Sequence, residues 1–389
     1  MQKISSPIES DSPFSRGLLT LYAVAFLSGL SLGLFNPFVS TLMTQAGISS
    51  VWIGANSALY FFTIAIGTPV VGKLVQKIGL RKTMMAGFGL MGIVAPLFPW
   101  TDNLVLWFVL RMVMGGAVCL YLISGQTAIN AFCTDSNRAT VNGFDALTFS
   151  LGFGLGPILG AAAYDVSPKI TFGLGGLLIL SGIAIILVGL PERNIRFHPP
   201  RLNVFNRIKL PLQGAFSYGV AIATLVSLYP VYLLRQEYAV SQIGYIFSAF
   251  ILGGLLSTLP VTYLADKVGR LPVLKASILA IVFSVIGLSL TDQVLTVQLL
   301  AFACGAAMSP IFPLSLAIIG SRLKKKDLPS GTSLFTTAYS AGCTVGPILS
   351  GLAMQYVGNR YLFTPILLAF LVLGYSLLSQ RTIARDLRT

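Results

Sequence analysis

The chain repeats itself at a constant offset of 190 residues, which is about half of its length of 389. The segment GFGLGPILGAA, which begins at Gly152, returns as GCTVGPILSGL at Gly342. The same offset relates further pairs without any gap: Ala25 and Ala215, Phe26 and Phe216, Gly29 and Gly219, Gly54 and Gly244, Gly79 and Gly269, and Gly115 and Gly305. One half-sized unit has therefore been duplicated, and the fold must hold two similar copies of it side by side.

Each copy is too apolar for a water-soluble domain. Hydrophobic residues make up 55% of the chain and charged residues 10%, against about 25% charge in soluble domains. An apolar run of roughly 20 residues crosses a bilayer. The sequence therefore predicts an all-α membrane protein with 12 transmembrane helices in two pseudo-symmetric six-helix bundles, with spans at 18–43, 52–74, 82–100, 104–125, 141–164, 170–190, 211–234, 243–264, 271–290, 294–319, 331–356 and 361–380.

The loops and their charges set the expected domains and orientation. Residues 1–190 form the N-terminal six-helix bundle, 191–210 a basic cytoplasmic linker with three prolines, and 211–389 the C-terminal six-helix bundle. Of 26 Lys and Arg residues, only three lie in the odd-numbered loops: Lys169, Arg235 and Arg360. This positive-inside bias predicts a multi-pass protein of the cell membrane with both termini in the cytoplasm. It implies contact with membrane lipid and leaves no basic face for nucleic acid.

Two loops carry related motifs. Residues 72–82 read GKLVQKIGLRK, and residues 262–271 read TYLADKVGRL. Both resemble the loop signature G-x-x-x-D-R/K-x-G-R-R/K of the major facilitator superfamily, and the six-plus-six arrangement is similar over essentially the whole chain. The resemblance implies that Asp266 latches the cytoplasmic side against a helix N-terminus of the opposite half, whereas neutral Gln76 makes a weaker latch. The glycine of each motif allows a sharp turn between two helices.

The fourth and fifth predicted helices carry two further motifs. RMVMGGA, from Arg111, resembles the superfamily motif R-x-x-x-G-x-x. The fifth helix fits G-x-x-x-G-P-x-x-G, which is similar to the pattern of drug and metabolite exporters driven by proton exchange. The pattern predicts a hinge-like bend, tight packing at a domain seam, or both together. It occurs in both halves, which weakens an interpretation specific to antiporters: Gly152, Gly156 and Pro157, then Gly342, Gly346 and Pro347.

Two charges inside predicted spans are candidates for coupling or gating, because such charges are costly in a bilayer. Arg111 lies roughly 10 Å from the outer edge and Asp145 about 6 Å from the inner edge at 1.5 Å per residue, so we expect no ion pair between them. Arg111 is either structural or in contact with substrate or coupling ion. Asp145 either suits the dipole of the fifth helix or gates the cytoplasmic side by pairing with Lys267 or Arg270.

In the resembled fold the binding site lies near the midplane, between the halves, on helices 1, 4, 7 and 10. The candidate cavity residues are Asn36, Tyr60, Tyr121, Gln126, Tyr218, Tyr229, Tyr232, Phe302, Ser309, Phe312 and Tyr339. This lining is aromatic and nearly neutral, which favours a lipophilic or weakly polar solute. For any single aromatic residue, packing or contact with lipid is the alternative.

These features favour a secondary active transporter that works by alternating access and exports a lipophilic or weakly polar small molecule, with protons as the candidate coupling ion. The alternatives on the same fold are an uptake carrier or facilitator of a neutral solute and a lipid flippase. An enzyme needs clustered reactive side chains at membrane depth, and a nucleotide-driven pump needs G-x-x-x-x-G-K-[ST]; the sequence contains neither. We expect a monomer without a cofactor, a bound metal or a disulfide.

Overall fold

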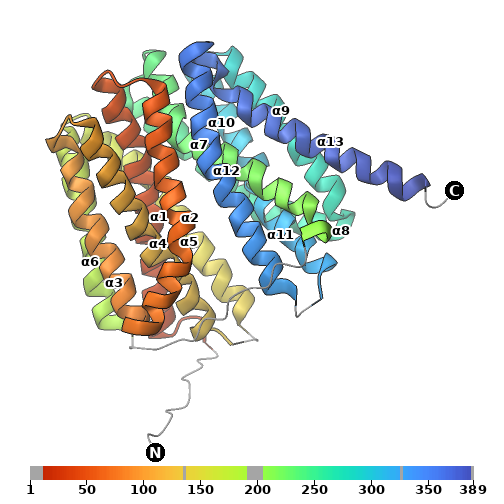
Figure 1. The fold of residues 1–389 in the computed structure, drawn as a ribbon, viewed down its shortest axis with the longest axis horizontal. Helices are drawn as coiled ribbons and strands as arrows, with labels where there is room; N and C mark the ends of the chain where they lie inside the picture. The colour runs from red at the N-terminus through yellow and green to blue at the C-terminus, as the bar shows by residue number, and fades with distance from the viewer. Residues whose placement is uncertain (1–11, 135–136, 191–204, 325–326, 387–389) are drawn as a thin grey trace, which may run out of the picture.

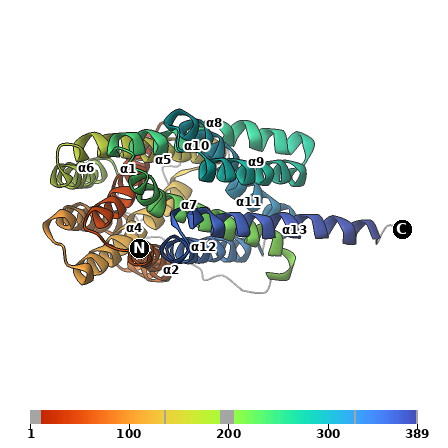
Figure 2. The same ribbon diagram turned by 90° about the horizontal axis from the view of Figure 1, so that it is seen from above.

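The computed structural model describes residues 12–134, 137–190, 205–324 and 327–386, which form helices and connecting turns. The N-terminal bundle lies at the left of Figure 1 and the C-terminal bundle at the right, and Figure 2 shows the same pair from above. The helices are α1 (Arg16–Gln45), α2 (Ser50–Ile78), α3 (Leu80–Val94), α4 (Leu104–Phe132), α5 (Arg138–Tyr164), α6 (Pro168–Gly189), α7 (Lys209–Arg235), α8 (Val240–Val268), α9 (Arg270–Leu290), α10 (Val294–Met308), α11 (Ile311–Arg322), α12 (Leu328–Tyr356) and α13 (Thr364–Asp386).

Eleven helical segments of the described residues are long and apolar enough to cross a membrane, α10 and α11 counting as one. The predicted span 331–356 is not among them. Its helix, α12, has 29 residues, which is long enough, but it contains many Ser, Thr and Gly residues. Because α12 packs against α7 of its own bundle and α2 of the other, it takes the place of the twelfth membrane helix. The chain is an all-α membrane protein of two six-helix bundles, as predicted.

Proline interrupts two of the predicted spans. Span 82–100 does not stay α-helical, because its last turns form the 3-10 helix η1 (Ala95–Trp100), which contains two prolines. Span 294–319 is not one helix, because Ser309 and Pro310 separate α10 from α11. Proline has no N–H group for the helical hydrogen bond and clashes with the preceding turn. Both predicted spans are confirmed as segments that could cross a membrane, and each is interrupted within its length.

Two glycines make the short connections inside the bundles. Gly79 joins α2 to α3 with a φ of 90°, and Gly269 joins α8 to α9 with a φ of 105°. A side chain at such positive φ values clashes with the backbone, so glycine is the residue that adopts them readily. The predicted sharp turns are confirmed at both positions, 190 residues apart.

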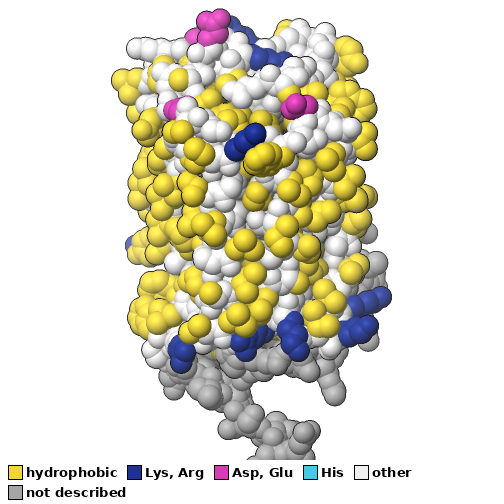
Figure 3. All heavy atoms as spheres, turned by 90° about the vertical axis from the view of Figure 1, so that its left-hand side faces the viewer, with side chains coloured by type: hydrophobic (Ala, Val, Ile, Leu, Met, Phe, Trp, Pro, Cys, Tyr) yellow, Lys and Arg dark blue, Asp and Glu magenta, His cyan; other side chains and the backbone are white. Residues whose placement is uncertain are grey.

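Charged side chains distinguish the two ends of the molecule. Figure 3 shows the N-terminal bundle with a row of Lys and Arg side chains along its lower end, whereas acidic side chains lie toward its upper end together with a few Lys and Arg. Lys77 and Lys267 lie in the last turns of α2 and α8, and we call this end the basic end. The other end, where Asp102 and Asp165 connect helices, is called the opposite end. The predicted linker 191–210 lies mostly outside the described residues, so the domain boundaries stay a prediction.

Candidate functional site

The repeated glycine–proline motif packs two helices together inside each bundle. A Cβ atom on Gly156 of α5 would lie 2.7 Å from the backbone of α1, and one on Gly346 of α12 would lie 2.5 Å from a carbonyl oxygen of α7. Gly152 and Gly342, the first glycines of the two motifs, approach the same helices even more closely. Only glycine leaves room for such backbone contact. This face of the motif therefore packs helices within a bundle and not between bundles.

A second face of the same motif joins the two bundles. A Cβ atom on Gly244 of α8 would lie 2.8 Å from the carbonyl oxygen of Pro157 in α5. In the same way, a Cβ atom on Gly54 of α2 would clash with the carbonyl oxygen of Pro347 in α12. The two contacts are copies of each other at the 190-residue offset. We call Gly54, Pro157, Gly244 and Pro347 the Gly–Pro seam.

The Gly–Pro seam lies toward the opposite end of the molecule. α2 and α8 both start at that end, and Gly54 and Gly244 are in their first turns. Ser248, one turn further along α8, donates a hydrogen bond from Oγ to the carbonyl oxygen of Gly154 at 2.8 Å. Among the described glycines, each one whose Cβ atom would touch the other bundle lies in this region. The bundles are therefore in backbone contact at the opposite end.

Three of the candidate residues meet inside the N-terminal bundle. Arg111 Nη2 of α4 donates a hydrogen bond to Asn36 Oδ1 of α1 at 2.6 Å, and its guanidinium carbon lies 4.3 Å from the centre of the Tyr60 ring of α2. Arg111 is 0% exposed and the other two are 1% exposed. Within the described residues, Arg111 Nε and Nη1 have no hydrogen-bond partner. We call Asn36, Tyr60 and Arg111 the Arg111 site; it holds a cation buried in a bilayer-spanning region, which marks a functional candidate.

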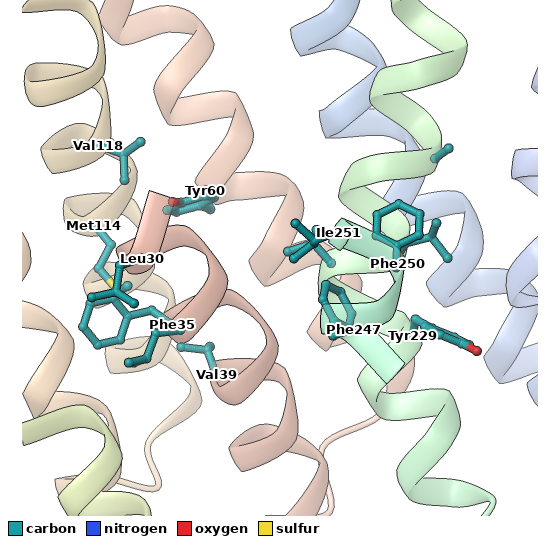
Figure 4. Close-up of a cluster of buried hydrophobic side chains, with 14 of the residues drawn as sticks. Leu30, Phe35, Val39, Tyr60, Met114, Val118, Tyr229, Phe247, Phe250 and Ile251 are labelled. Carbon is teal, nitrogen blue, oxygen red and sulfur yellow. The ribbon is translucent and has the colours of Figure 1, made fainter. Parts of the chain in front are cut away.

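Close packing holds the Arg111 site in place. A Cβ atom on Gly115 would lie 2.6 Å from the carbonyl oxygen of Tyr60, so α2 and α4 are in backbone contact. One turn away, Asn56 Nδ2 donates a hydrogen bond to the carbonyl oxygen of Trp107 at 3.3 Å. Figure 4 shows Tyr60 among apolar side chains of the N-terminal bundle. The packing of α2 against α4 therefore holds Arg111 in position.

Three other candidates form an aromatic cluster in the C-terminal bundle. The Tyr218 ring lies 5.7 Å from Phe312 and 6.0 Å from Tyr339, and the latter two rings are 5.5 Å apart, between centroids. All three side chains are half-buried. Tyr229 and Tyr232 stack separately at 5.9 Å, further toward the opposite end of α7. We keep the name aromatic cluster for Tyr218, Phe312 and Tyr339.

The remaining cavity candidates lie elsewhere. The Tyr121 hydroxyl shares a hydrogen bond with Ser31 Oγ at 2.5 Å inside the N-terminal bundle. Gln126 is exposed near the basic end of α4. Phe302 and Ser309 lie where α10 and the turn after it meet glycines of α8. The structure thus brings together two groups of candidates, one in each bundle.

Asp145 is half-buried on α5. The helix begins at Arg138 rather than at the predicted residue 141, so Asp145 lies about two turns inside it. The effect of a helix dipole falls off within the first turn, and the dipole interpretation of Asp145 loses its basis. The ring of the adjacent Phe144 lies 5.7 Å from that of Tyr22 on α1.

The loop-motif residues contact their own bundle in this structure. Asp266 pairs with Arg270, with Oδ1 and Nη2 3.7 Å apart, and Arg270 Nη1 donates a hydrogen bond to the carbonyl oxygen of Ala317 at 2.7 Å. Lys267 Nζ lies 4.6 Å from the Tyr263 ring centre. Gln76 is exposed at the matching end of α2. The predicted pairing of Asp145 with Lys267 or Arg270 is not made here, and it was expected only when the cytoplasmic side is closed.

Sequence reasoning gave no role to Gly54, Gly244, Ser248 or Asn56. The recurrence of Gly54 as Gly244 was an available signal, since a glycine kept in both copies indicates close backbone approach. No comparable signal marks Ser248 or Asn56, because isolated polar residues in apolar helices are common and their partners depend on the tertiary structure.

Comparison with known proteins identifies relatives over nearly the whole chain. A family model described as Major Facilitator Superfamily matches residues 21–212 and again residues 212–386. The MFS-type transporter YfkF of Bacillus subtilis is 26% identical over 356 residues, which cover 88% of this chain and 90% of the relative. The MFS-type transporter YcaD of Salmonella newport is 24% identical over 365 residues, covering 91% and 93%.

Solved structures share the fold. The nucleoside transporter NupG superposes with a TM-score of 0.77 at 16% identity and covers 93% of this chain and 98% of its own. A bacterial homologue of the human lysosomal transporter Spinster, in an inward-facing and unoccupied conformation, superposes with a TM-score of 0.74 at 12% identity, covering 95% of both chains. At these identities the likeness shows the fold alone.

Proposed function

Because this chain belongs to the major facilitator superfamily, it is a transporter and not an enzyme, and we propose that it is a secondary active transporter working by alternating access. The solute is a lipophilic or weakly polar small molecule. The direction is export, and the driving reaction is exchange with protons. Transport by such a protein requires no cofactor.

The Gly–Pro seam is the observation that carries this proposal. The bundles meet there through glycine Cα atoms and proline carbonyl oxygens, twice, at positions related by the internal repeat. Contacts of the Cα–H···O type contribute only about 0.5–1 kcal/mol each, so the seam can part at small cost. Alternating access needs an interface that opens at one end while the other end closes, and a seam held by such weak contacts suits this requirement.

The orientation follows from the charges. We place the basic end in the cytoplasm because Lys and Arg are retained on that side of membranes. The Gly–Pro seam then closes the outer side, and this structure represents a state in which the outer side is shut. The opposite state must part the seam and bring the basic ends of α5 and α8 together.

Asp145 is the proposed coupling carboxylate. It is the half-buried acid of the α5 span, and Arg270 at the basic end of the other bundle is its proposed partner when that end closes. In the state described here, Arg270 pairs with Asp266 instead. A double-mutant cycle on Asp145→Asn and Arg270→Gln, read out as the rate of probe equilibration without a pH gradient, tests this exchange of partners. Additive effects of the two substitutions would contradict the gate.

The transport assay uses purified protein in proteoliposomes with an imposed pH gradient. We would follow Nile red, Hoechst 33342 and 1-anilinonaphthalene-8-sulfonate, which are lipophilic probes that are neutral, weakly basic and anionic. An exporter driven by proton exchange accumulates at least one probe against its gradient on the acidic side, and accumulation collapses when an ionophore dissipates the pH gradient.

Two variants make the result specific to Asp145. Asp145→Asn should abolish accumulation, whereas the matched variant Asp102→Asn, which removes an exposed acid at the opposite end, should leave it unchanged. Accumulation that survives Asp145→Asn would move proton coupling to another residue. Equilibration of probe without any dependence on the gradient would replace the exporter with a facilitator of the same fold.

A further inference from the structure

We propose that the Arg111 site binds the single carboxylate of a lipophilic substrate. The inference rests on the transport function proposed above and names the class of solute. It concerns a monoanion, because the site offers one buried cation and its surroundings are apolar.

The strongest argument is the missing counter-charge. Arg111 is 0% exposed, and a buried charge is stable only when it is paired and hydrogen-bonded. Asn36 Oδ1 accepts from Nη2, but Asn36 is neutral. In the described part of the chain, the N–H group on Nε and the two on Nη1 have no acceptor. The guanidinium therefore has three hydrogen-bond donors available to a carboxylate.

Within the described residues, no acid is paired with Arg111. Asp266 pairs with Arg270, and Asp292 pairs with Arg360. Asp145 enters α5 from the basic end, whereas Arg111 enters α4 from the opposite end. The two helices have 29 and 27 residues, which is about 40 Å each at 1.5 Å per residue. Each of the two residues lies seven residues, about 10 Å, inside its own end, so their levels differ by about 20 Å. An external anion is left as the partner.

The position of the site fits a substrate rather than a lipid headgroup. Tyr60 follows Gly54 of the Gly–Pro seam by six residues, roughly 9 Å along α2, on the side of the basic end. The site thus lies just below the closed contact between the bundles, where a transporter of this fold binds its solute near the midplane. Because the guanidinium is fully buried, a ligand reaches it only when Asn36 or Tyr60 moves aside.

The surroundings indicate a lipophilic body attached to the carboxylate. Leu30, Met114 and Val118 belong to the same buried apolar cluster as Tyr60 (Figure 4). Within the described residues, a second anionic group would find no other buried cation to pair with, and burying it would be costly. The half-buried aromatic cluster of the C-terminal bundle provides ring faces for the apolar part of such a molecule. A lipophilic monocarboxylate therefore satisfies the site, and a polyanion does not.

The test compares 2-naphthoate with its neutral analogue 2-naphthamide. Purified protein in a neutral detergent, in chloride-free buffer at pH 8, is heated with increasing concentrations of each compound. A ligand that binds only the folded state raises the melting temperature, and we expect a rise of about 2 °C or more at saturating naphthoate. Naphthamide, which has the same ring system without the charge, should produce no such rise.

Two variants locate the effect. Arg111→Gln removes the cation and should abolish the naphthoate shift. Asn36→Asp places a carboxylate beside the guanidinium, where it forms an ion pair with Arg111. This variant should melt at a higher temperature than the wild type and should also lose the naphthoate shift. Arg360→Gln, a cation substitution in the other bundle, is the matched control and should keep the shift. If Arg111→Gln does not fold, Asn36→Asp decides the question.

The outcomes separate this inference from the transport proposal. Equal shifts with naphthoate and naphthamide, or a naphthoate shift that persists in Asn36→Asp, would overturn the carboxylate site. A shift reproduced by chloride alone would also overturn it, because a resident inorganic anion would then satisfy Arg111. The melting assay needs no pH gradient, so its result can be interpreted even if gradient-driven transport is not observed. Conversely, the absence of a naphthoate shift would not affect the conclusion of the transport assay.

Discussion

Adding one methyl group to the Gly–Pro seam should shift the protein away from the state described here. In Gly244→Ala the new Cβ atom would lie 2.8 Å from the Pro157 carbonyl oxygen and 2.7 Å from Ala161 Cβ, whereas ordinary contacts begin at 3.4 Å. α8 and α5 must therefore separate by about 0.7 Å. Overpacking of this kind costs about 1–3 kcal/mol. The cost falls only on the state with a closed seam, so the ratio of the two states should change about 5- to 150-fold.

Distances between spin labels report this change directly. Val166 and Val357 are exposed and lie at the opposite end of the two bundles, so cysteines introduced there carry labels across the seam. The four native cysteines are free and buried, which limits unwanted labelling. Double electron–electron resonance on Gly244→Ala should show a larger population of long distances than the parent protein shows.

The controls use other glycines of the same chain. Gly116→Ala adds a methyl group that would meet nothing within 4 Å, and its distance distribution should match the parent. Gly54→Ala, the equivalent change at the other copy of the seam, should shift the distribution in the same direction as Gly244→Ala. If Gly244→Ala and Gly116→Ala give the same distribution, the seam does not control the opening of the opposite end and the reasoning fails.

Three further substitutions test the packing and the polar contacts. Gly156→Ala should lower the melting temperature far more than Gly116→Ala, because its Cβ atom would lie 2.7 Å from the backbone of α1 within one bundle. Asn36→Ala should destabilise the protein by about 1–3 kcal/mol, since it leaves another buried guanidinium N–H unpaired; a thermal melt against exposed Asn142→Ala checks this, and equal melting temperatures would contradict it. Ser248→Ala removes a hydrogen bond between the bundles worth about 1 kcal/mol and should lengthen the spin-label distances, with no loss of secondary structure by circular dichroism.

Much of the architecture was predictable because the bilayer constrains it. A chain that crosses the hydrocarbon core must satisfy its backbone within helices of a minimum length, so the apolar runs located the helices. The internal repeat divided them into two bundles. Gly79 and Gly269 marked the turns, because a positive φ excludes most side chains. The interruptions of the helices at η1 and Pro310 were not predicted, although the prolines are visible in the sequence. Hydropathy indicates where an apolar span lies, but it does not indicate whether the α-helix is continuous through that span.

The pairing of residues came from the tertiary structure. In a membrane, the faces of a helix that contact lipid and those that contact protein are equally apolar, so the pattern of the sequence does not tell which face meets which helix. The glycine motif of α5 was recognisable, but only packing showed that one face contacts α1 and the other contacts α8. In the same way, the sequence placed Arg111 inside the membrane, and only the packing of α1 and α2 against α4 surrounded it with Asn36 and Tyr60.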